Sequence, residues 1–379
     1  MMLQILYLYN IKIYYMEDKV NKMIGLLDKA KDEGYMVGCE DMVQSLSVHP
    51  IGDDGIPTHC IINPIVLDYF RQLPEGGYIK GDTSRMWHYY KYVRPYANKN
   101  MADRSNPYLV FVDGDYLVLE CDDEEPQTIL PENKFFACYF LMPYKVYRWK
   151  VYKGGKVIKE SSFRTVGDIR LINLPTWPNL RDIGGFGMKH GLVYSAANPD
   201  EVVVGSDDYK VIKYLGIDTQ INLRKPKEGS ASEKPWRKDI FTYGYNIDIA
   251  AYASVFYLPN GFKQAFETLV SELEKGRKVV FNCFAGADRT GTFRYILQGL
   301  CGVPKRIAQG HYELTTLLWW QNSKMWGRYD DDGYDFNELD EALEARYGKD
   351  FYKQCYRLMT EVVKVSPEKI KKFQDIMKA

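Results

Sequence analysis

Residues 283–290, CFAGADRT, combine a cysteine, small loop residues and an arginine in one short stretch. A thiolate can attack phosphorus, and the guanidinium of Arg289 can grip two phosphoryl oxygens at once. The small residues allow the loop to curl with its N–H groups inward, which binds a tetrahedral dianion and favours a thiolate at Cys283. Thr290 can hydrogen-bond the sulfur when it leaves. The stretch therefore predicts a phosphate held over a nucleophile for in-line attack. The predicted phosphate-binding residues are Phe284, Ala285, Gly286, Ala287, Asp288 and Arg289.

A strand and a helix must position this loop. The apolar run RKVVFN predicts a strand at 277–282 that delivers Cys283 to the carboxyl edge of a sheet, where ligand sites of α/β proteins lie. TGTFRYILQGLCG predicts the following helix, at 290–302. From about residue 170 strands and helices alternate, which predicts an α/β layer with a mostly parallel sheet. The other predicted elements are a helix at 206–216, a strand at 218–223, a helix at 260–276 and mostly helix over the last fifty residues.

The chain before residue 169 has a different pattern. Residues 55–168 contain short apolar-alternating runs between turn signals, which predicts a small all-β sandwich. Residues 144–165 resemble the last two strands of a fibronectin type III or immunoglobulin-like domain. Apolar residues at helical spacing predict a helix at 17–33. We therefore expect an N-terminal segment at 1–54, a β-sandwich module at 55–168 and a catalytic domain at 169–379.

Composition narrows the functional classes. The formal net charge of the 379 residues is +0, so no bulk electrostatic attraction to nucleic acid or an anionic membrane is expected. Seven cysteines without a CxxC pair and five histidines without ligand spacing argue against a disulfide framework or a metal site. No cofactor is expected.

The first fifteen residues are apolar but are interrupted by Lys12 and are too short to span a bilayer, so no integral membrane segment is expected. We expect the natural start at Met16 and a cytoplasmic location. If the apolar segment is a signal sequence, the protein is instead secreted or periplasmic.

Other chemistry fits the cysteine loop less well. A cysteine followed by an arginine six positions later is a weak signal alone, and the alternative is a buried cysteine with a solvated Arg289. A Walker phosphate loop is excluded because the chain has no GxxxxGK[ST]. A cysteine protease or acyltransferase needs a histidine base, and the nearest candidate, His311, has no orienting motif around it.

The cysteine loop and four other stretches of the chain resemble the motifs of one family. CFAGADRTG resembles the cysteine phosphatase signature HCxxGxxRT, and more fully the HCxAGKDRTG loop of a bacterial and fungal tyrosine phosphatase family. NLRDIGGF (179–186) resembles the NFRDLGG motif of that family. GLVYSAANPDE resembles its G-x-x-x-R-S stretch, with the serine retained as Ser195. INLR (221–224) resembles its DLR motif, and HYELTTL (311–317) resembles its DYxLT motif. The resemblance covers residues 170–325. It implies a cysteine phosphatase fold and a protein-tyrosine or dual-specificity phosphatase acting through a phosphocysteine.

The resemblance also implies partners. The expected substrate is a phosphorylated protein or a small phosphomonoester, not nucleic acid. Some bacterial relatives carry a similar β-domain in front. For the β-module of this chain, a protein or glycan partner is expected. The alternatives are an inositol phosphate or phosphoinositide phosphatase, and a catalytically weak phosphate-binding adaptor.

Three positions depart from the family pattern. Asn282 stands where the family has the histidine that supports the loop, which favours the weak adaptor. Ala287 stands where some members have lysine, which weakens the case for polyanionic phosphoinositides. Asn222 stands where the family often has aspartate.

The general acid has two candidates. The resemblance suggests Asp288, whose alternative role is to cap a helix beginning at Thr290. Asp248 competes, on a segment that could overhang the pocket as a mobile acid loop does in other tyrosine phosphatases.

Two further charged groups precede the loop. We expect Arg181 and Asp182 to form a structural ion pair. Arg224, Lys225 and Lys227 form either a basic rim or a solvated charged face.

Overall fold

A computed structural model describes residues 55–63, 66, 70, 105–122, 124–132, 135–172, 174–224, 241–244, 252–318 and 336–379. The described chain divides into two compact units. The first contains the described residues from 55 to 66 and from 105 to 170. The second contains Phe70 and the described residues from 171 onward. The expected helix at 17–33 and the acid candidate Asp248 lie outside the described residues.

The first unit is built from β sheets, as the alternating runs predict. A five-stranded sheet has the order β1-β7-β6-β3-β4, and β2 pairs with β5 in a second sheet. A single hydrophobic cluster draws on both sheets, through Tyr108, Val110, Leu117, Leu119, Phe136, Cys138, Tyr147, Trp149, Val151 and Phe163. The strands are β1 (Thr58–Cys60), β2 (Tyr108–Val110), β3 (Tyr116–Cys121), β4 (Glu124–Ile129), β5 (Phe136–Cys138), β6 (Val146–Lys153) and β7 (Lys156–Val166).

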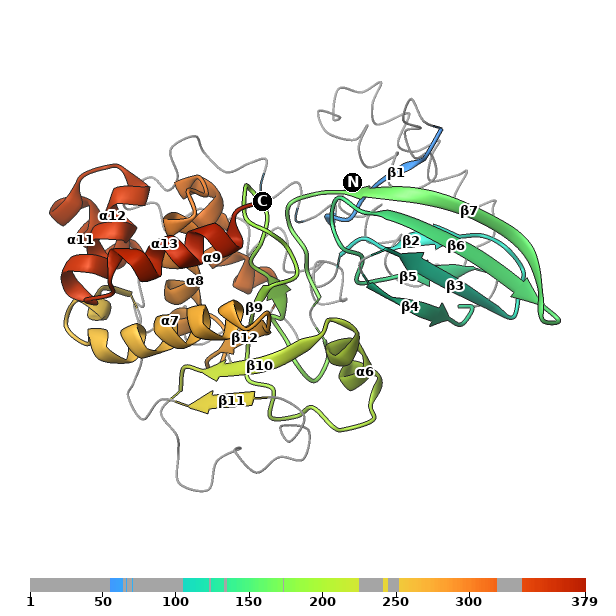
Figure 1. The fold of residues 1–379 in the computed structure, drawn as a ribbon, viewed down its shortest axis with the longest axis horizontal. Coiled ribbons are helices and arrows are strands. Elements are labelled where there is room, and N and C mark those ends of the chain that lie inside the picture. The colour runs from blue at the N-terminus through green and yellow to red at the C-terminus, as the bar shows by residue number, and fades with distance from the viewer. Residues whose placement is uncertain are drawn as a thin grey trace. The chain divides into compact units, whose positions relative to one another are not determined.

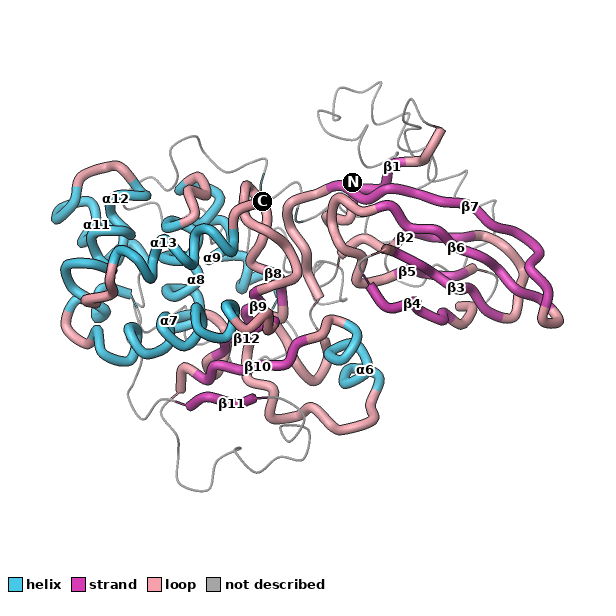
Figure 2. Tube along the Cα trace, in the orientation of Figure 1, coloured by secondary structure: helices cyan, strands magenta, loops and turns pink. Residues whose placement is uncertain are grey.

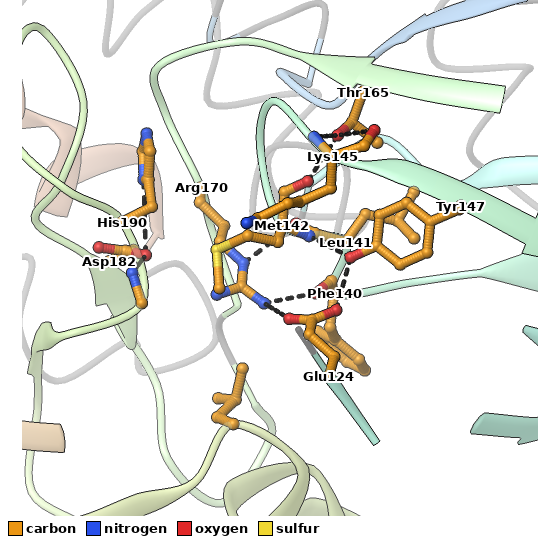
Figure 3. Close-up of polar contacts among 12 residues, drawn as sticks. Glu124, Phe140, Leu141, Met142, Lys145, Tyr147, Thr165, Arg170, Asp182 and His190 are labelled. Carbon is orange, nitrogen blue, oxygen red and sulfur yellow. Dashed lines mark hydrogen bonds and ion pairs between the residues drawn. The ribbon is translucent and has the colours of Figure 1, made fainter. Parts of the chain in front are cut away.

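Arg170 ends the first unit with a buried polar network (Figure 3). Its Nε donates to the carbonyl of Leu141 at 3.0 Å and its Nη2 to the carbonyl of Phe140 at 2.6 Å. Glu124 lies 3.9 Å from the same guanidinium and also accepts the phenol proton of Tyr147, at 2.6 Å. A buried arginine is tolerated because its charge and donors are satisfied in this way.

The second unit has a five-stranded sheet in the order β11-β10-β12-β9-β8. Four strands run parallel and β8 pairs antiparallel with β9, so the sheet is mostly parallel, as predicted. The central strand β12 is buried over its last four residues, which explains its unbroken apolar run. The bounds are β8 (Arg181–Asp182), β9 (Val193–Ala196), β10 (Ile217–Asn222), β11 (Phe241–Gly244) and β12 (Lys278–Asn282).

Helices cover this sheet and give the region its mixed α/β character (Figures 1 and 2). Ser206 accepts a hydrogen bond from the N–H of Tyr209 and so caps α6 (Asp207–Tyr214). The predicted apolar face of α7 (Pro259–Glu274) is buried, against β10 and β12. The helix after the cysteine loop is α8 (Asp288–Leu300), which packs on β9 and β12.

The carboxyl-terminal part is helical, as predicted. A helix α9 (Lys305–Leu318) packs on α8, and so does α12 (Phe351–Arg357). Ser366 and Pro367 begin the last helix as expected. The other helical elements are α11 (Phe336–Tyr347), the π-helix η4 (Leu358–Val362) and α13 (Pro367–Met377).

Within the described part of the chain, no helix is long and apolar enough to cross a membrane. Among the described residues, six cysteines form no disulfide with one another: Cys60, Cys121, Cys138, Cys283, Cys301 and Cys355.

Candidate active site

Cys283 directly follows β12 at the carboxyl edge of the parallel sheet. Asn282, the last residue of that strand, is in register with Asn222 of β10 and Ala196 of β9. The side chain of Cys283 is 2% exposed, whereas the next residue, Phe284, is 48% exposed. The strand thus places the thiol inside the loop and an aromatic ring at its rim.

Gly286 allows the loop to turn against the end of β9. Its φ of +70° lies in the left-handed region that favours glycine. A Cβ at this position would lie 2.6 Å from the carbonyl oxygen of Ala196 and 2.7 Å from the amide nitrogen of Ala197. Ala285, Ala287 and Ala197 form a small buried cluster beside it. Gly286 is therefore required by the close approach of the loop to the backbone of Ala196 and Ala197.

Two asparagines bind the outward side of the loop. The N–H of Asn198 donates to the carbonyl of Phe284 at 2.9 Å. The side-chain amide of Asn179 donates to the carbonyls of Ala285 and Gly286, both at 3.1 Å. In a trans peptide the C=O and the following N–H point in opposite directions. The amides that follow these three carbonyls therefore face away from the asparagines, as a phosphate nest requires.

Arg289 and Thr290 enter α8 directly after the loop. Arg289 is the second residue of the helix and is half-buried. Thr290 is fully buried, and its hydroxyl makes no hydrogen bond within the described part of the chain. A buried donor of this kind is available for a group that only appears during a reaction, such as a departing thiolate.

Asp288 does not cap the helix, which was the alternative role predicted for it from the sequence. The helix begins at Asp288 itself, and the capping position, Ala287, provides no side-chain hydrogen bond. The prediction of a cap for a helix beginning at Thr290 is therefore wrong. Instead, Oδ1 of Asp288 accepts a hydrogen bond from the phenol of Tyr252.

Asn282 occupies a buried position behind the cysteine. Its Oδ1 accepts a hydrogen bond from Nε2 of Gln220 at 2.6 Å, and its Nδ2 donates to the carbonyl of Cys283 at 3.1 Å. Both side chains are fully buried. A pair of neutral amides thus occupies the place where the family has a titratable histidine.

Arg294 provides a buried positive charge near the loop. It donates to Oγ of Ser195 and to the carbonyl of His311, each at 2.9 Å. Burial lowers the pKa of Arg294 to about 10, and electrostatic interactions with Tyr312 and Cys283 oppose that effect. The guanidinium therefore stays charged at neutral pH and interacts electrostatically with Cys283.

His311 does not form a catalytic pair with the cysteine. Burial, followed by the charges of Arg181, Arg294 and His190, holds the pKa of His311 well below its usual 6.5. Neither ring nitrogen makes a hydrogen bond within the described residues. A neutral imidazole without a bond to Cys283 argues against the cysteine protease reading.

Arg181 and Asp182 bind different partners. Arg181 donates to Oγ1 of Thr315 at 2.8 Å. The carboxylate of Asp182 accepts from the N–H groups of Gly184 and Gly191, at 2.9 and 2.6 Å, and lies 3.5 Å from Nδ1 of His190 (Figure 3). No ion pair between these two neighbours is found among the described residues, because successive side chains of a strand point to opposite faces.

Arg224 is paired rather than presented as an open basic rim. Its guanidinium lies 3.3 Å from the carboxylate of Asp200, and its Nε donates to Oδ1 of Asn222 at 3.2 Å. Asp200 also accepts from Nδ2 of Asn198 at 2.6 Å, which connects this pair to the loop. Lys225 and Lys227 lie outside the described residues.

Among the site residues that the sequence analysis did not single out are Asn179, Gln220, Tyr252 and Arg294. Asn179 opens the NLRDIGGF motif, so the motif itself could have indicated it. Arg294 is the one charged residue between Thr290 and Cys301, in a stretch that predicts an otherwise apolar helix. A single charge in such a helix is also a detectable signal. Gln220 and Tyr252 carry no local signal, because their partners are distant in sequence.

No group of three or more His, Cys, Asp or Glu side chains among the described residues is arranged to hold a metal ion. The loop and the elements beside it contribute a thiol, a buried cation, an arginine, a carboxylate and backbone amides. Together these groups suit nucleophilic attack on a bound anion.

Comparison with known proteins agrees with this arrangement. A protein of Cupriavidus necator named "Putative tyrosine-protein phosphatase H16_A0669" is 24% identical over 165 residues, which cover 36% of this chain. The chain spans 60% of the length of that relative.

A solved structure named "Putative phosphatase (DUF442)", from Shewanella putrefaciens CN-32, aligns at 15% identity with a TM-score of 0.20. The alignment covers 35% of this chain and 90% of that one, and at such a score it supports no structural argument.

A family model described as "Tyrosine phosphatase family" matches residues 172–379, which is more than half of the chain and includes every site residue described above. The chain belongs to the tyrosine phosphatase family.

Proposed function

We propose that this chain hydrolyses phosphate monoesters through a phosphocysteine at Cys283. The observation that carries the proposal is the loop itself. Its cysteine follows the central parallel strand, its arginine lies in the first turn of α8, and asparagines bind three consecutive carbonyls on its outer side. In our proposal the loop amides and the guanidinium of Arg289 bind a phosphoryl group above the sulfur.

The first half of the reaction transfers the phosphoryl group to sulfur. The thiolate of Cys283 attacks phosphorus, so that an S–P bond forms while the bond to the ester oxygen breaks. Arg289 and the loop amides bind the non-bridging oxygens. A carboxyl group, Asp288 or Asp248, gives its proton to the departing oxygen, which leaves as an alcohol or phenol.

The second half returns the enzyme to its starting state. Water attacks the phosphocysteine and gives a proton to the same carboxylate. The S–P bond breaks, phosphate is released and the thiolate of Cys283 is restored. The buried hydroxyl of Thr290 is the donor we assign to the departing sulfur, because it has no other hydrogen bond among the described residues.

We assign phosphotyrosine proteins as the substrate class, with dual specificity as an extension. The exposed ring of Phe284 beside the buried thiol suits an aryl ester. Arg224, paired with Asp200, and the small Ala287 offer little to the extra phosphates of an inositol phosphate or phosphoinositide. A weak phosphate-binding adaptor is disfavoured because Asn282 makes the supporting bonds that a loop histidine would provide.

The nucleophile can be tested with one pair of variants. Cys283→Ser should abolish turnover of an aryl phosphate while retaining vanadate binding, since the loop amides and Arg289 remain. Cys301→Ser is the matched control, because Cys301 lies at the far end of α8. It should keep the parent turnover. Parent-like turnover by Cys283→Ser would refute the mechanism.

For the front of the chain we propose that residues 55–168 contribute an immunoglobulin- or fibronectin III-like sandwich that binds a protein or glycan, separate from the catalytic domain that follows it. The support is the hydrophobic cluster that both of its sheets share. Deletion of this module should change where or to what the phosphatase binds, as measured by binding to a glycan and protein array.

A further inference from the structure

A tyrosine far from the loop in sequence holds the carboxylate of Asp288. Tyr252 opens the short 3-10 helix η2 (Tyr252–Phe256), and its phenol donates to Oδ1 of Asp288. The side chain of Tyr252 is 6% exposed, and Asp288 is half-buried. Within the described part of the chain, no donor bonds the second oxygen, Oδ2. One oxygen of this carboxyl group is thus fixed and the other is available.

The position of Tyr252 is determined by several contacts. Its own N–H donates to Oγ1 of Thr292 at 2.9 Å, one turn along α8 from Asp288. Its ring lies 6.1 Å from the ring of Tyr312. The buried side chains of Val255 and Phe256 hold the rest of η2. These contacts fix the phenol with respect to the same helix that carries Asp288.

The backbone of Tyr252 is strained. Its φ of +54° lies in the left-handed region, which a bulky residue rarely adopts. Such conformations persist where the surrounding structure enforces them, and they cluster at functional sites. The strain is therefore consistent with a requirement for the hydroxyl at this place.

We propose that Tyr252 is a positioning residue that orients Asp288 as the general acid. The proposal rests on the proposed function. As the bond from phosphorus to the ester oxygen breaks and the S–P bond forms, the proton on Oδ2 of Asp288 moves to the departing oxygen. Tyr252 keeps its own proton and continues to donate to Oδ1. Its hydrogen bond strengthens as the carboxyl group becomes a carboxylate, so it favours the transition state over the ground state.

Asp248 is the competing acid, and a purely structural bond is the competing role for Tyr252. The two roles differ in their dependence on the leaving group. Loss of the general acid slows the hydrolysis of esters with poor leaving groups and spares activated esters, because an activated phenoxide departs without a proton. If the hydrogen bond from Tyr252 only stabilises the fold, its loss lowers the turnover of both ester types equally.

The test compares 4-nitrophenyl phosphate with phenyl phosphate in the full chain. Tyr252→Phe should reduce kcat for phenyl phosphate about tenfold, part of the 10²- to 10⁴-fold that a positioned acid contributes. It should leave kcat for 4-nitrophenyl phosphate nearly unchanged. Asp288→Asn should show the same contrast more strongly. The double variant should be no slower than Asp288→Asn, because Tyr252 acts through that carboxyl group.

Tyr295→Phe is the matched control. The buried phenol of Tyr295, also on α8, donates to Oδ1 of Asp340 at 2.7 Å. This variant removes the same kind of bond at a site away from the loop. It should lower the thermal midpoint without changing the ratio of the two kcat values.

An unchanged ratio in Tyr252→Phe, whether both rates fall together or neither falls, would overturn the positioning role. The same contrast in Asp248→Asn but not in Asp288→Asn would also overturn it. Turnover by the unaltered chain that does not depend on Cys283 would overturn the proposed function and this inference with it.

Discussion

At the scale of single residues, Asn282 stands where the family motif has histidine, and it makes two buried hydrogen bonds of its own. Gln220 supplies a hydrogen bond, and Asn282 in turn holds the carbonyl of Cys283. We propose that these two neutral amides support the loop in place of an imidazole. The loop should therefore keep its shape over a broad pH range, because neither group titrates.

A double-mutant cycle tests whether the two amides are coupled. Asn282→Leu strands the buried Nε2 of Gln220 and should cost about 1–3 kcal/mol of stability. Gln220→Met should cost a similar amount, and the double variant should recover part of the loss, since both polar partners are then gone. Urea unfolding of the four proteins measures this. Strictly additive losses would show that the two amides are not coupled.

Activity should behave differently from stability in that cycle. Asn282→Leu removes the donor to the Cys283 carbonyl, so the double variant should remain as slow as the single one. Recovery of turnover along with stability would mean that Asn282 supports the fold and not the loop.

At the scale of elements, the loop and the end of β9 fit each other closely. Gly286→Ala adds a Cβ 2.6 Å from the carbonyl oxygen of Ala196 at a φ that disfavours alanine. The cost should be about 1–3 kcal/mol, with a large fall in kcat/KM because the amides are displaced. Gly302→Ala is the control. Gly302 also has a positive φ, but a Cβ there meets nothing within 4 Å, so activity should persist. Equal activity in the two variants would contradict the fit.

The sequence predicted elements well where the apolar pattern was strong. The run from 277 to 282 and the capped helix after Ser206 both form as expected. The polar strand β4, EEPQTI, was not predicted because it contains Pro126 and few apolar residues. It lies at the edge of its sheet, where proline is tolerated. Here tertiary pairing overrides local propensity.

The candidate site was predictable only in part. The cysteine, the arginine and the small loop residues lie in one short stretch, so their spacing in the sequence was enough to predict the loop. The bond from Tyr252 to Asp288 joins positions 36 residues apart, and that from Asn179 to the loop spans more than 100. Periodicity carries no information on such pairs, which appear only when the sheet brings distant segments together.

At the scale of the whole molecule, the site should function without the front unit. We expect residues 171–379, which contain the described second unit apart from Phe70, to turn over an aryl phosphate at a rate similar to that of the full chain. The fragment should begin after Arg170, whose guanidinium is satisfied within the first unit and would otherwise be an unpaired charge. It must include Trp177, whose buried indole donates to the carbonyl of Ala197. A folded but inactive fragment would show that the front unit completes the site.

Acid should destabilise the fold through His311. Its pKa is held well below 6.5 by burial and then by Arg181, Arg294 and His190. The unfolded chain therefore binds a proton first as the pH falls below about 6.5. Stability is fully present above that pH and is lost below it, by up to about 1.4 kcal/mol per pH unit until the folded pKa is reached. Urea midpoints between pH 7 and pH 5 should fall less steeply in His311→Gln. An equal slope would refute this assignment.

The most direct test of the central claim is to trap the intermediate. The unaltered chain is mixed with an aryl phosphate, quenched in acid within one turnover, and mapped by peptide mass spectrometry. The account predicts a phosphoryl group on Cys283, formed at the rate of the initial burst of phenol and absent from Cys283→Ser. A burst without phosphate on that sulfur, or phosphate on another residue, would contradict the account.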